Sequence, residues 1–419
     1  SIFTVRFPVS AGLQINSDAN HSMSNGAFYK PVGGGALLNF EDADNLPQTI
    51  DSCSFIGSAG ADTNVRANAS TSYNGSDPVT FINYGGSLAP NATDAELYDA
   101  DPNDQITWFS NKYYSNSFSK TNPSINTSWF SETDGTGFNP SLIDFTTNSN
   151  IEYVIINFDQ LRAESDWTNP GTLTLNASSI IDPGNFTINS ANTNITILAT
   201  LRFSFGNGTF EVDAGGTFVN EGTIDGMTVG DTLKIALATP NLAVNTGNFT
   251  RGTGTVEYNG AVQDIDNEIY HNLTISAAGA KTAGQDLVVA GDLNVSAGDL
   301  VIGNNSLTLT GDFSMSGGSF TAGNNTGHTV GGSWTETGGT FSPGSVGKFT
   351  FEAVGGDKTI TTLASFYDLS INTGGNNVSA AAVLTVNNDF TMEALNTGNF
   401  STGSNTVTVT GATNIDGGV

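Results

Sequence analysis

Two consecutive segments of this chain repeat one pattern, and the repetition restricts the fold more than any other feature of the sequence. Gly298, Gly318 and Gly339 open successive copies that are 20 and 21 residues apart. The first copy ends on Phe313 and the second on Trp334, each after an alternating or glycine-rich run. Repeats of about 20 residues with strand alternation and glycine corners are typical of coiled β-solenoids. The predicted fold class is all-β, a parallel β-helix (β-solenoid) with coils of about 20–24 residues.

In a stack of parallel coils, each strand pairs with the equivalent strand one turn above and below, so equivalent side chains form rows. Leu293, Phe313 and Trp334 occupy equivalent positions and are predicted to stack inside the coil. Asn304 and Asn324 lie at successive Gly-Asn-Asn corners, where we expect them to form a ladder of side-chain amides.

A longer repeat runs through the second half of the chain. Tyr270 and Tyr367 open related phrases 97 residues apart, and residues 287–293 return as residues 384–390 at the same interval. The spacing predicts a superrepeat of about 97 residues, made of four or five coils.

The pattern divides the chain into three parts. Residues 1–118 contain short alternating segments separated by Gly, Asn, Asp and Ser, which predicts a first β-helix segment. Residues 119–165 are predicted to form an irregular junction between two consecutive solenoid segments. Residues 166–419 are predicted to form the second β-solenoid, which carries the superrepeat and is expected to continue beyond residue 419.

Three phrases of the first part resemble the last coils of right-handed parallel β-helix domains. They are residues 50–55 (IDSCSF), 79–84 (VTFINY) and 101–108 (DPNDQITW), and the resemblance covers residues 30–109. Such domains occur in large secreted surface proteins, especially of Bacteroidota-type bacteria. Residues 167–419 similarly resemble the repeats of bacterial surface adhesins and filaments. The resemblance implies an extracellular location at the cell surface.

The charge balance argues against several classes of partner. The chain has 40 acidic and 12 basic residues, which gives a net charge of −28. Such a chain repels phosphates and anionic lipids, so neither nucleic-acid binding nor a basic membrane patch is expected. Cys53 is the single cysteine, which excludes an intrachain disulfide and a Cys-based metal cage. The sequence contains no apolar run long enough to predict a membrane-spanning helix.

Two acidic segments are candidates for calcium binding, because Ca²⁺ is held by six to eight oxygen ligands. The segments lack the glycine and glutamate pattern of a proper calcium loop, so solvated acidic loops are the alternative. No other cofactor is predicted. The candidate ligands are Asp42, Asp44, Asp99, Asp101 and Asp104.

Four aromatic residues near the predicted junction are candidates for ligand binding. Trp108, Tyr113, Tyr114 and Trp129 could form a platform on which sugar rings stack. Alternatively, the rings pack against one another and close the end of the first helix, as bulky aromatic residues at a junction usually do.

The sequence contains little that points to catalysis. Asp264, Asp266 and Glu268 are close in sequence, as the paired carboxylates of a polysaccharide lyase or hydrolase require, but the corresponding segment 358–360 has no acid. The three histidines are isolated. We therefore expect a non-catalytic, extracellular structural or adhesive repeat protein that forms a rod or filament. Its expected partners are other copies or parts of the same surface protein, and surface glycans. The alternatives are a carbohydrate-active β-helix enzyme and a glycan-binding spike.

Overall fold

A computed structural model describes two compact units of the chain, residues 1–161 with 170–174 (unit 1) and residues 162–169 with 175–419 (unit 2). Up to residue 109 it describes the strands only. Beyond that point it describes residues 112–115, 122–124, 126–130, 151–155, 160–169, 171–176, 179–190, 194–198, 200–203, 207–244, 247–393 and 397–416. Asp42, Asp44, Asp101 and Asp104, four of the predicted calcium ligands, lie outside the described residues.

The strands up to residue 109 form three parallel sheets, which the chain visits in rotation. This is the parallel β-helix arrangement that the sequence predicts for this segment. The first sheet contains β1 (Phe3–Arg6), β4 (Gly26–Lys30) and β7 (Ser54–Gly57). The second contains β2 (Leu13–Ile15), β5 (Leu38–Phe40), β8 (Val65–Ala67) and β10 (Asp99–Ala100). The third contains β3 (Ser22–Ser24), β6 (Gln48–Asp51), β9 (Val79–Ile82) and β11 (Ile106–Phe109).

Unit 1 also contains an antiparallel pair beside a parallel one. β12 (Lys112–Ser115) pairs antiparallel with β13 (Trp129–Phe130) and parallel with β14 (Glu152–Ile155). β17 (Thr172–Leu175) follows β14 in the same sheet. The short 3-10 helix η1 (Asn126–Ser128) is the single helix among the described residues. None of the residues described here forms a helix that could cross a membrane.

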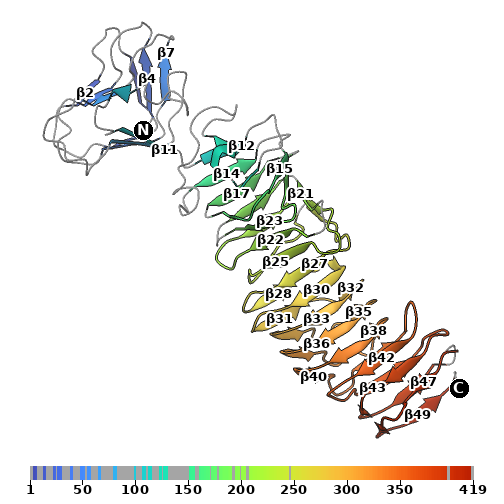
Figure 1. Cartoon of the computed structure of the whole chain (residues 1–419). Helices are drawn as coiled ribbons and strands as arrows, with labels where there is room; N and C mark the ends of the chain where they lie inside the picture. The colour runs from blue at the N-terminus through green and yellow to red at the C-terminus, as the bar shows by residue number, and fades with distance from the viewer. Residues whose placement is uncertain are drawn as a thin grey trace. The chain divides into compact units, whose positions relative to one another are not determined.

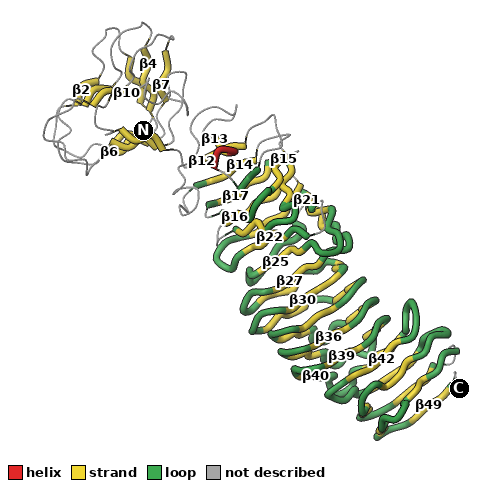
Figure 2. Tube along the Cα trace, viewed as in Figure 1, coloured by secondary structure: helices red, strands yellow, loops and turns green. Residues whose placement is uncertain are grey.

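Unit 2 is a parallel β-solenoid of about 12 turns, with roughly 21 residues per turn. Figures 1 and 2 show its strands stacked in successive turns and joined by short loops. We call its longest sheet, which has 12 strands, sheet 1. The strands of sheet 1 are β16 (Trp167–Thr168), β19 (Thr187–Asn189), β22 (Thr209–Val212), β25 (Thr232–Ile235), β27 (Thr255–Tyr258), β30 (Asn272–Ile275), β33 (Leu293–Val295), β36 (Phe313–Met315), β39 (Trp334–Glu336), β42 (Lys358–Thr361), β44 (Val378–Ala380) and β47 (Phe400–Ser401).

Two further sheets form the other sides of the later turns. Sheet 2 consists of β28 (Gln263–Ile265), β31 (Ala280–Ala283), β34 (Asp299–Val301), β37 (Ser319–Thr321) and β40 (Thr340–Ser342). Sheet 3 consists of β29 (Ile269–Tyr270), β32 (Leu287–Val289), β35 (Leu307–Leu309), β38 (His328–Val330), β41 (Lys348–Phe351), β43 (Asp368–Ile371), β46 (Phe390–Met392) and β49 (Thr413–Ile415). β45 (Leu384–Val386) pairs with β48 (Val407–Val409).

In the earlier turns of the solenoid, the two sides other than sheet 1 are formed by two different sheets, which we call sheets 4 and 5. Sheet 4 includes β18 (Ile180–Asp182), β21 (Thr200–Arg202), β24 (Thr223–Asp225) and β26 (Asn248–Phe249) in unit 2, and β15 (Gln160–Arg162) precedes them. Sheet 5 includes β20 (Ile195–Ile197) and β23 (Phe218–Asn220) in unit 2. Sheet 1 is therefore the side that the earlier and later turns share.

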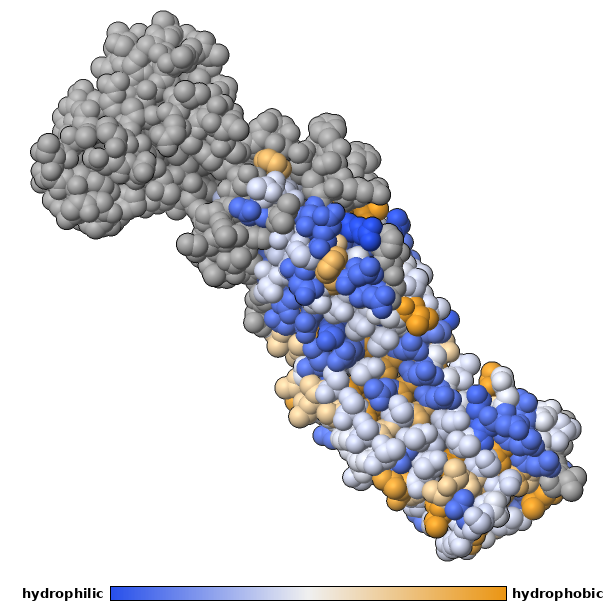
Figure 3. Space-filling model, in the orientation of Figure 1, coloured by the Kyte–Doolittle hydropathy of each residue, from blue (hydrophilic) through white to orange (hydrophobic). Residues whose placement is uncertain are grey.

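The core of unit 2 consists of rows of apolar side chains that run from turn to turn. Strand residues alternate between buried and partly exposed positions, as β22 and β25 illustrate. Leu293, Phe313 and Trp334 pair in register on β33, β36 and β39 and are completely buried. Their predicted inner row is confirmed. On the face shown in Figure 3, orange apolar residues form scattered groups among hydrophilic and intermediate residues.

The Gly-Asn-Asn corners differ in one detail from the prediction. Instead of an amide ladder between Asn304 and Asn324, the amide of Asn325 donates to the backbone oxygen of Asn304 over 2.8 Å. The side-chain oxygen of Asn324 accepts the backbone N–H of Ser345, over 2.8 Å. The side chains of Asn324 and Asn325 therefore bind the backbone of an adjacent turn. A short amide side chain at a corner can satisfy a backbone group that would otherwise lack a partner.

Aspartates at another corner bind the backbone in the same way. The carboxylate of Asp292 accepts the backbone N–H of Asp312, and the carboxylate of Asp312 accepts the backbone N–H of Ser333, both over 2.8 Å. Part of the large negative charge thus serves to connect successive turns, because a carboxylate is a strong acceptor for a backbone N–H.

Candidate functional site

The aromatic residues near residue 113 lie in the interior of unit 1. Tyr113 on β12 and Trp129 on β13 are buried and Tyr114 is partly exposed. The rings of Tyr113 and Trp129 both pack on Tyr153, with centroid distances of 6.3 and 4.9 Å. The indole nitrogen of Trp129 donates to the backbone oxygen of Pro123. These contacts match the packing alternative, and the role of the group in binding a ligand stays a prediction.

For two other predicted site residues, the structure describes the strand but not the side chain. Trp108 belongs to β11 and Asp99 begins β10, and their side chains are outside the described part of the chain. Among the residues that the structure describes, no group of three or more His, Cys, Asp or Glu side chains could hold a metal ion. The calcium prediction therefore remains untested.

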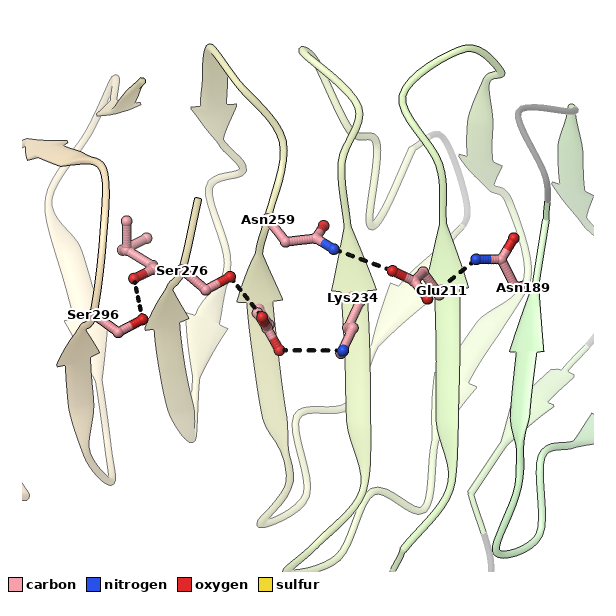
Figure 4. A network of polar contacts seen from close by, with 8 residues as sticks. Asn189, Glu211, Lys234, Asn259, Ser276 and Ser296 are labelled. Atoms are coloured by element: carbon pink, nitrogen blue, oxygen red, sulfur yellow. Dashed lines mark hydrogen bonds and ion pairs between the residues drawn. The ribbon is translucent and has the colours of Figure 1, made fainter. Parts of the chain in front are cut away.

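A strip of polar side chains lies along sheet 1 and forms a network of contacts between successive turns of unit 2 (Figure 4). We define the polar strip as Asn189, Glu211, Lys234, Glu257, Asn259 and Ser276. Glu211 pairs in register with Asn189 on one side and with Lys234 on the other, and Lys234 pairs with Glu257. Their side chains leave the sheet on the side opposite to the apolar inner row, because successive residues of a strand point to opposite faces.

The members of the polar strip bind one another across turns. Glu211 accepts hydrogen bonds from the side-chain amides of Asn189 and Asn259, at 3.1 and 3.2 Å. Glu257 accepts the hydroxyl of Ser276 at 2.5 Å and lies 4.0 Å from the ammonium of Lys234. All six side chains of the polar strip are partly exposed, so the ion pair between Lys234 and Glu257 contributes little stability. The side-chain oxygen of Asn259 is buried and has no hydrogen-bond partner within the described residues.

Asp264, Asp266 and Glu268 lie where the solenoid changes its sheets. Asp264 is on β28, the first strand of sheet 2, and Glu268 precedes β29, the first strand of sheet 3. The carboxylate of Asp266 accepts the backbone N–H of Leu242 over 2.6 Å and that of Asn267 over 3.0 Å. Partial burial, and secondly the charge of Asp266, raise the pKa of Glu268.

Two buried polar residues of this region were not identified from the sequence. Lys281 and Gln263 are fully buried on the inner row of sheet 2, where neighbouring strands carry Leu300 and Phe320. Burial lowers the pKa of Lys281. A polar residue at an inward position of an alternating strand is the signal that could have identified both, since such positions are otherwise apolar.

Comparisons with known proteins found no counterpart for this chain. No family model matches it, and neither does any curated protein or solved structure. By its fold, this chain is a parallel β-solenoid.

Proposed function

We propose that this chain is part of an extracellular structural or adhesive repeat protein, which forms a rod or filament at a bacterial cell surface and has no catalytic activity. The observation that carries the proposal is sheet 1, whose 12 strands pair in parallel without interruption. A sheet of this kind gives each turn the same neighbours, so stability is added turn by turn and length can increase without a new core.

The polar strip supports an adhesive role on the same sheet. It presents amide and carboxylate groups at the spacing of the strands, which is about 4.8 Å. A polymer with repeated hydroxyl groups can bind to several turns at once, and linked weak contacts give a much higher affinity than one contact. Surface glycans are therefore the proposed ligand class, with other copies or other parts of the same surface protein as structural partners.

Electron microscopy of the purified full chain and of the native cell surface tests the structural proposal. We expect particles longer than they are wide, and rods or filaments that antibodies to this chain label on cells. A compact particle that depolymerises members of a broad glycan panel would overturn it.

Binding of the full chain to isolated cell-surface polysaccharide tests the adhesive part. A variant with Asn189→Ala, Glu211→Ala and Asn259→Ala should bind at least about tenfold more weakly, because the linked contacts are lost together. The control is Thr308→Ala with Thr329→Ala, on the outer row of sheet 3. Equal loss in both variants, or no loss in the strip variant, would exclude the polar strip as the binding surface.

One observation favours a second candidate, a carbohydrate-active enzyme. Glu268 combines a raised pKa with a position where the repeat is interrupted, and a carboxylic acid with a raised pKa suits a general acid. If the chain cleaves a polysaccharide, Glu268→Gln should reduce kcat by about 100-fold or more with an unchanged fold. Full activity in that variant would remove Glu268 as the acid, and the absence of any cleavage by the wild-type chain would remove this candidate.

A further inference from the structure

On two of the three sides of the unit 2 solenoid, one β-sheet ends and another begins within a short stretch of the chain. Among the described strands, sheet 5 ends with β23 and sheet 4 with β26, whereas sheets 2 and 3 begin with β28 and β29. We call residues 236–244 and 259–271, where this change occurs, the joint. Sheet 1 alone crosses the joint with continuous strand pairing, through β25, β27 and β30.

Side chains take over part of the strand pairing at the joint. Gln263 donates from its amide nitrogen to the backbone oxygens of Ile235 and Leu237, at 2.8 Å each, and accepts the backbone N–H of Gly260 at 2.7 Å. Together with the bond from Leu242 to Asp266, these contacts connect the turn before the joint to the turn after it. They supplement backbone hydrogen bonds that still cross the joint, such as the one from Asp264 to Ala238 at 2.7 Å.

The ammonium of Lys281 fixes the next corner. Lys281 is buried and donates to the backbone oxygens of Gly260 and Ala277, at 2.6 and 2.5 Å, and more weakly to three neighbouring ones. These carbonyl groups belong to two successive turns. A buried ammonium is tolerated only while such acceptors replace its water, so the corner depends on this one side chain.

The inner row of sheet 2 is also more polar at the joint than in the later turns. The hydroxyl groups of Tyr258 and Tyr270 lie 2.8 Å apart, and the hydroxyl of Tyr270 donates to the backbone oxygen of Asp266. On the inner row of sheet 2, Gln263 and Lys281 precede Leu300, Phe320 and Phe341. Opening the joint returns polar groups to water, whereas opening a later turn exposes apolar surface, which costs more free energy.

We propose that the joint is a built-in hinge of the solenoid, at which adjacent turns separate on two sides while sheet 1 holds them together. The turns of residues 287–342 then behave as one stiff body, since all three of their sides are paired from strand to strand in sheets 1, 2 and 3. In a surface rod, such a hinge would yield before the repeated turns do. This inference concerns the fold alone and holds whether or not the chain binds a glycan.

Hydrogen exchange of the full wild-type chain, followed by mass spectrometry, tests the hinge. Backbone amides of residues 236–244 and 259–271 should exchange at least about tenfold faster than those of residues 287–342, because local openings expose them without global unfolding. Amides of β25 and β30 should stay as protected as those of the later turns. Exchange at the joint that equals or is slower than exchange in residues 287–342 would overturn the proposal.

Lys281→Met tests the origin of the hinge, with Lys348→Met as the matched control. Both changes remove one positive charge, but Lys348 is a surface residue that pairs with Glu393. Lys281→Met should accelerate exchange at the joint several-fold and leave residues 287–342 unchanged, whereas Lys348→Met should leave the joint unchanged. An unaltered joint in Lys281→Met, or equal effects of both variants, would contradict the proposed role of Lys281. If Lys281→Met does not fold, the wild-type exchange profile decides alone.

Discussion

The ring of Phe313 stacks on the indole of Trp334 in the next turn of the solenoid, with ring centroids 3.9 Å apart and an interplanar angle of 27°. Both side chains are completely buried. Trp334 is also in edge contact with Phe349 and Phe366, and its indole nitrogen donates to the buried carboxylate of Glu336 over 2.6 Å. The Trp334 side chain thus links the aromatic core to a buried carboxyl group.

Replacing Trp334 by Ala should destabilise the chain by about 3–5 kcal/mol, because a large buried side chain leaves a cavity. Glu336 would in addition lose one of its donors, which places the effect at the upper end of this range. Denaturant unfolding followed by circular dichroism measures the change. Thr335→Ala, on the outer side of the same strand, should stay within about 0.5 kcal/mol of the wild type.

The buried imidazole of His328 should make the stability of the solenoid depend on pH. Its Nδ1 accepts the backbone N–H of Leu307 at 3.1 Å, its ring stacks on Phe349, and burial lowers its pKa to about 4 from 6.5. The unfolded chain therefore binds a proton between pH 6.5 and 4 that the folded chain does not. Stability is fully present above pH 6.5, falls as the pH decreases to about 4, and is constant below that, with a total loss of roughly 3 kcal/mol from this group.

Unfolding free energies of wild type and His328→Phe, measured from pH 7.5 to 4, isolate this contribution. Other groups titrate in both proteins, so the difference between the two curves reports on His328. The variant should be less stable at neutral pH, because the N–H of Leu307 loses its acceptor, and the gap should narrow as the pH decreases. Parallel curves would show that His328 is not buried in its neutral form.

Alanine substitutions of two glycines at equivalent corners would distinguish the cost of backbone strain from the cost of a steric clash. Gly303 and Gly323 have φ angles of 58° and 67°. A Cβ atom on Gly303 would meet no heavy atom within 4 Å, whereas one on Gly323 would lie 1.7 Å from the backbone oxygen of Gly303. Gly303→Ala should therefore cost about 1 kcal/mol through its left-handed backbone alone. Gly323→Ala should cost clearly more, as measured by denaturant unfolding, and equal losses would contradict the stacking of these corners.

Two substitutions of Asp312 would show whether its negative charge or its hydrogen bond stabilises the corner. Asp312 accepts the backbone N–H of Ser333, so Asp312→Ala should lower the free energy of unfolding by about 1 kcal/mol. Asp312→Asn keeps an acceptor oxygen and removes the repulsion from Asp292 in the neighbouring turn, so it should be close to neutral. The midpoints of denaturant unfolding compare the two. A loss in Asp312→Asn as large as in Asp312→Ala would assign the stabilisation to the charge instead.

The short repeat could be predicted from the sequence because its information is local. Apolar alternation and glycine corners recur every 20 or 21 residues, and this spacing is enough to place Leu293, Phe313 and Trp334 in one buried row. The same reasoning identified the parallel pairing of the strands before residue 109. The sequence pattern did not predict the joint. Whether a sheet is interrupted depends on how neighbouring turns pair, and no single segment of the sequence contains that information.

The superrepeat shows the same limit. The segment after Tyr270 forms β30 in sheet 1, whereas the related segment after Tyr367 forms β43 in sheet 3. Similarly, β32 and β33 lie in sheets 3 and 1, whereas their counterparts β45 and β46 lie beside β48 and in sheet 3. Equivalent strands of the two copies of the 97-residue unit therefore lie on different sides of the solenoid, one side apart. The interval fits the sequence pattern but is not a whole number of turns of roughly 21 residues.

By itself, the sequence determined that this chain coils, how long a turn is and which residues point inward, because hydrophobic alternation and corner glycines act within one turn. Only the tertiary structure decided which turns share a sheet, where two sides change, and which polar groups are enclosed. The reason is physical: the partner of each backbone group and of Lys281 lies about one turn away along the axis, and how the turns stack is settled only when neighbouring turns satisfy each other's hydrogen bonds.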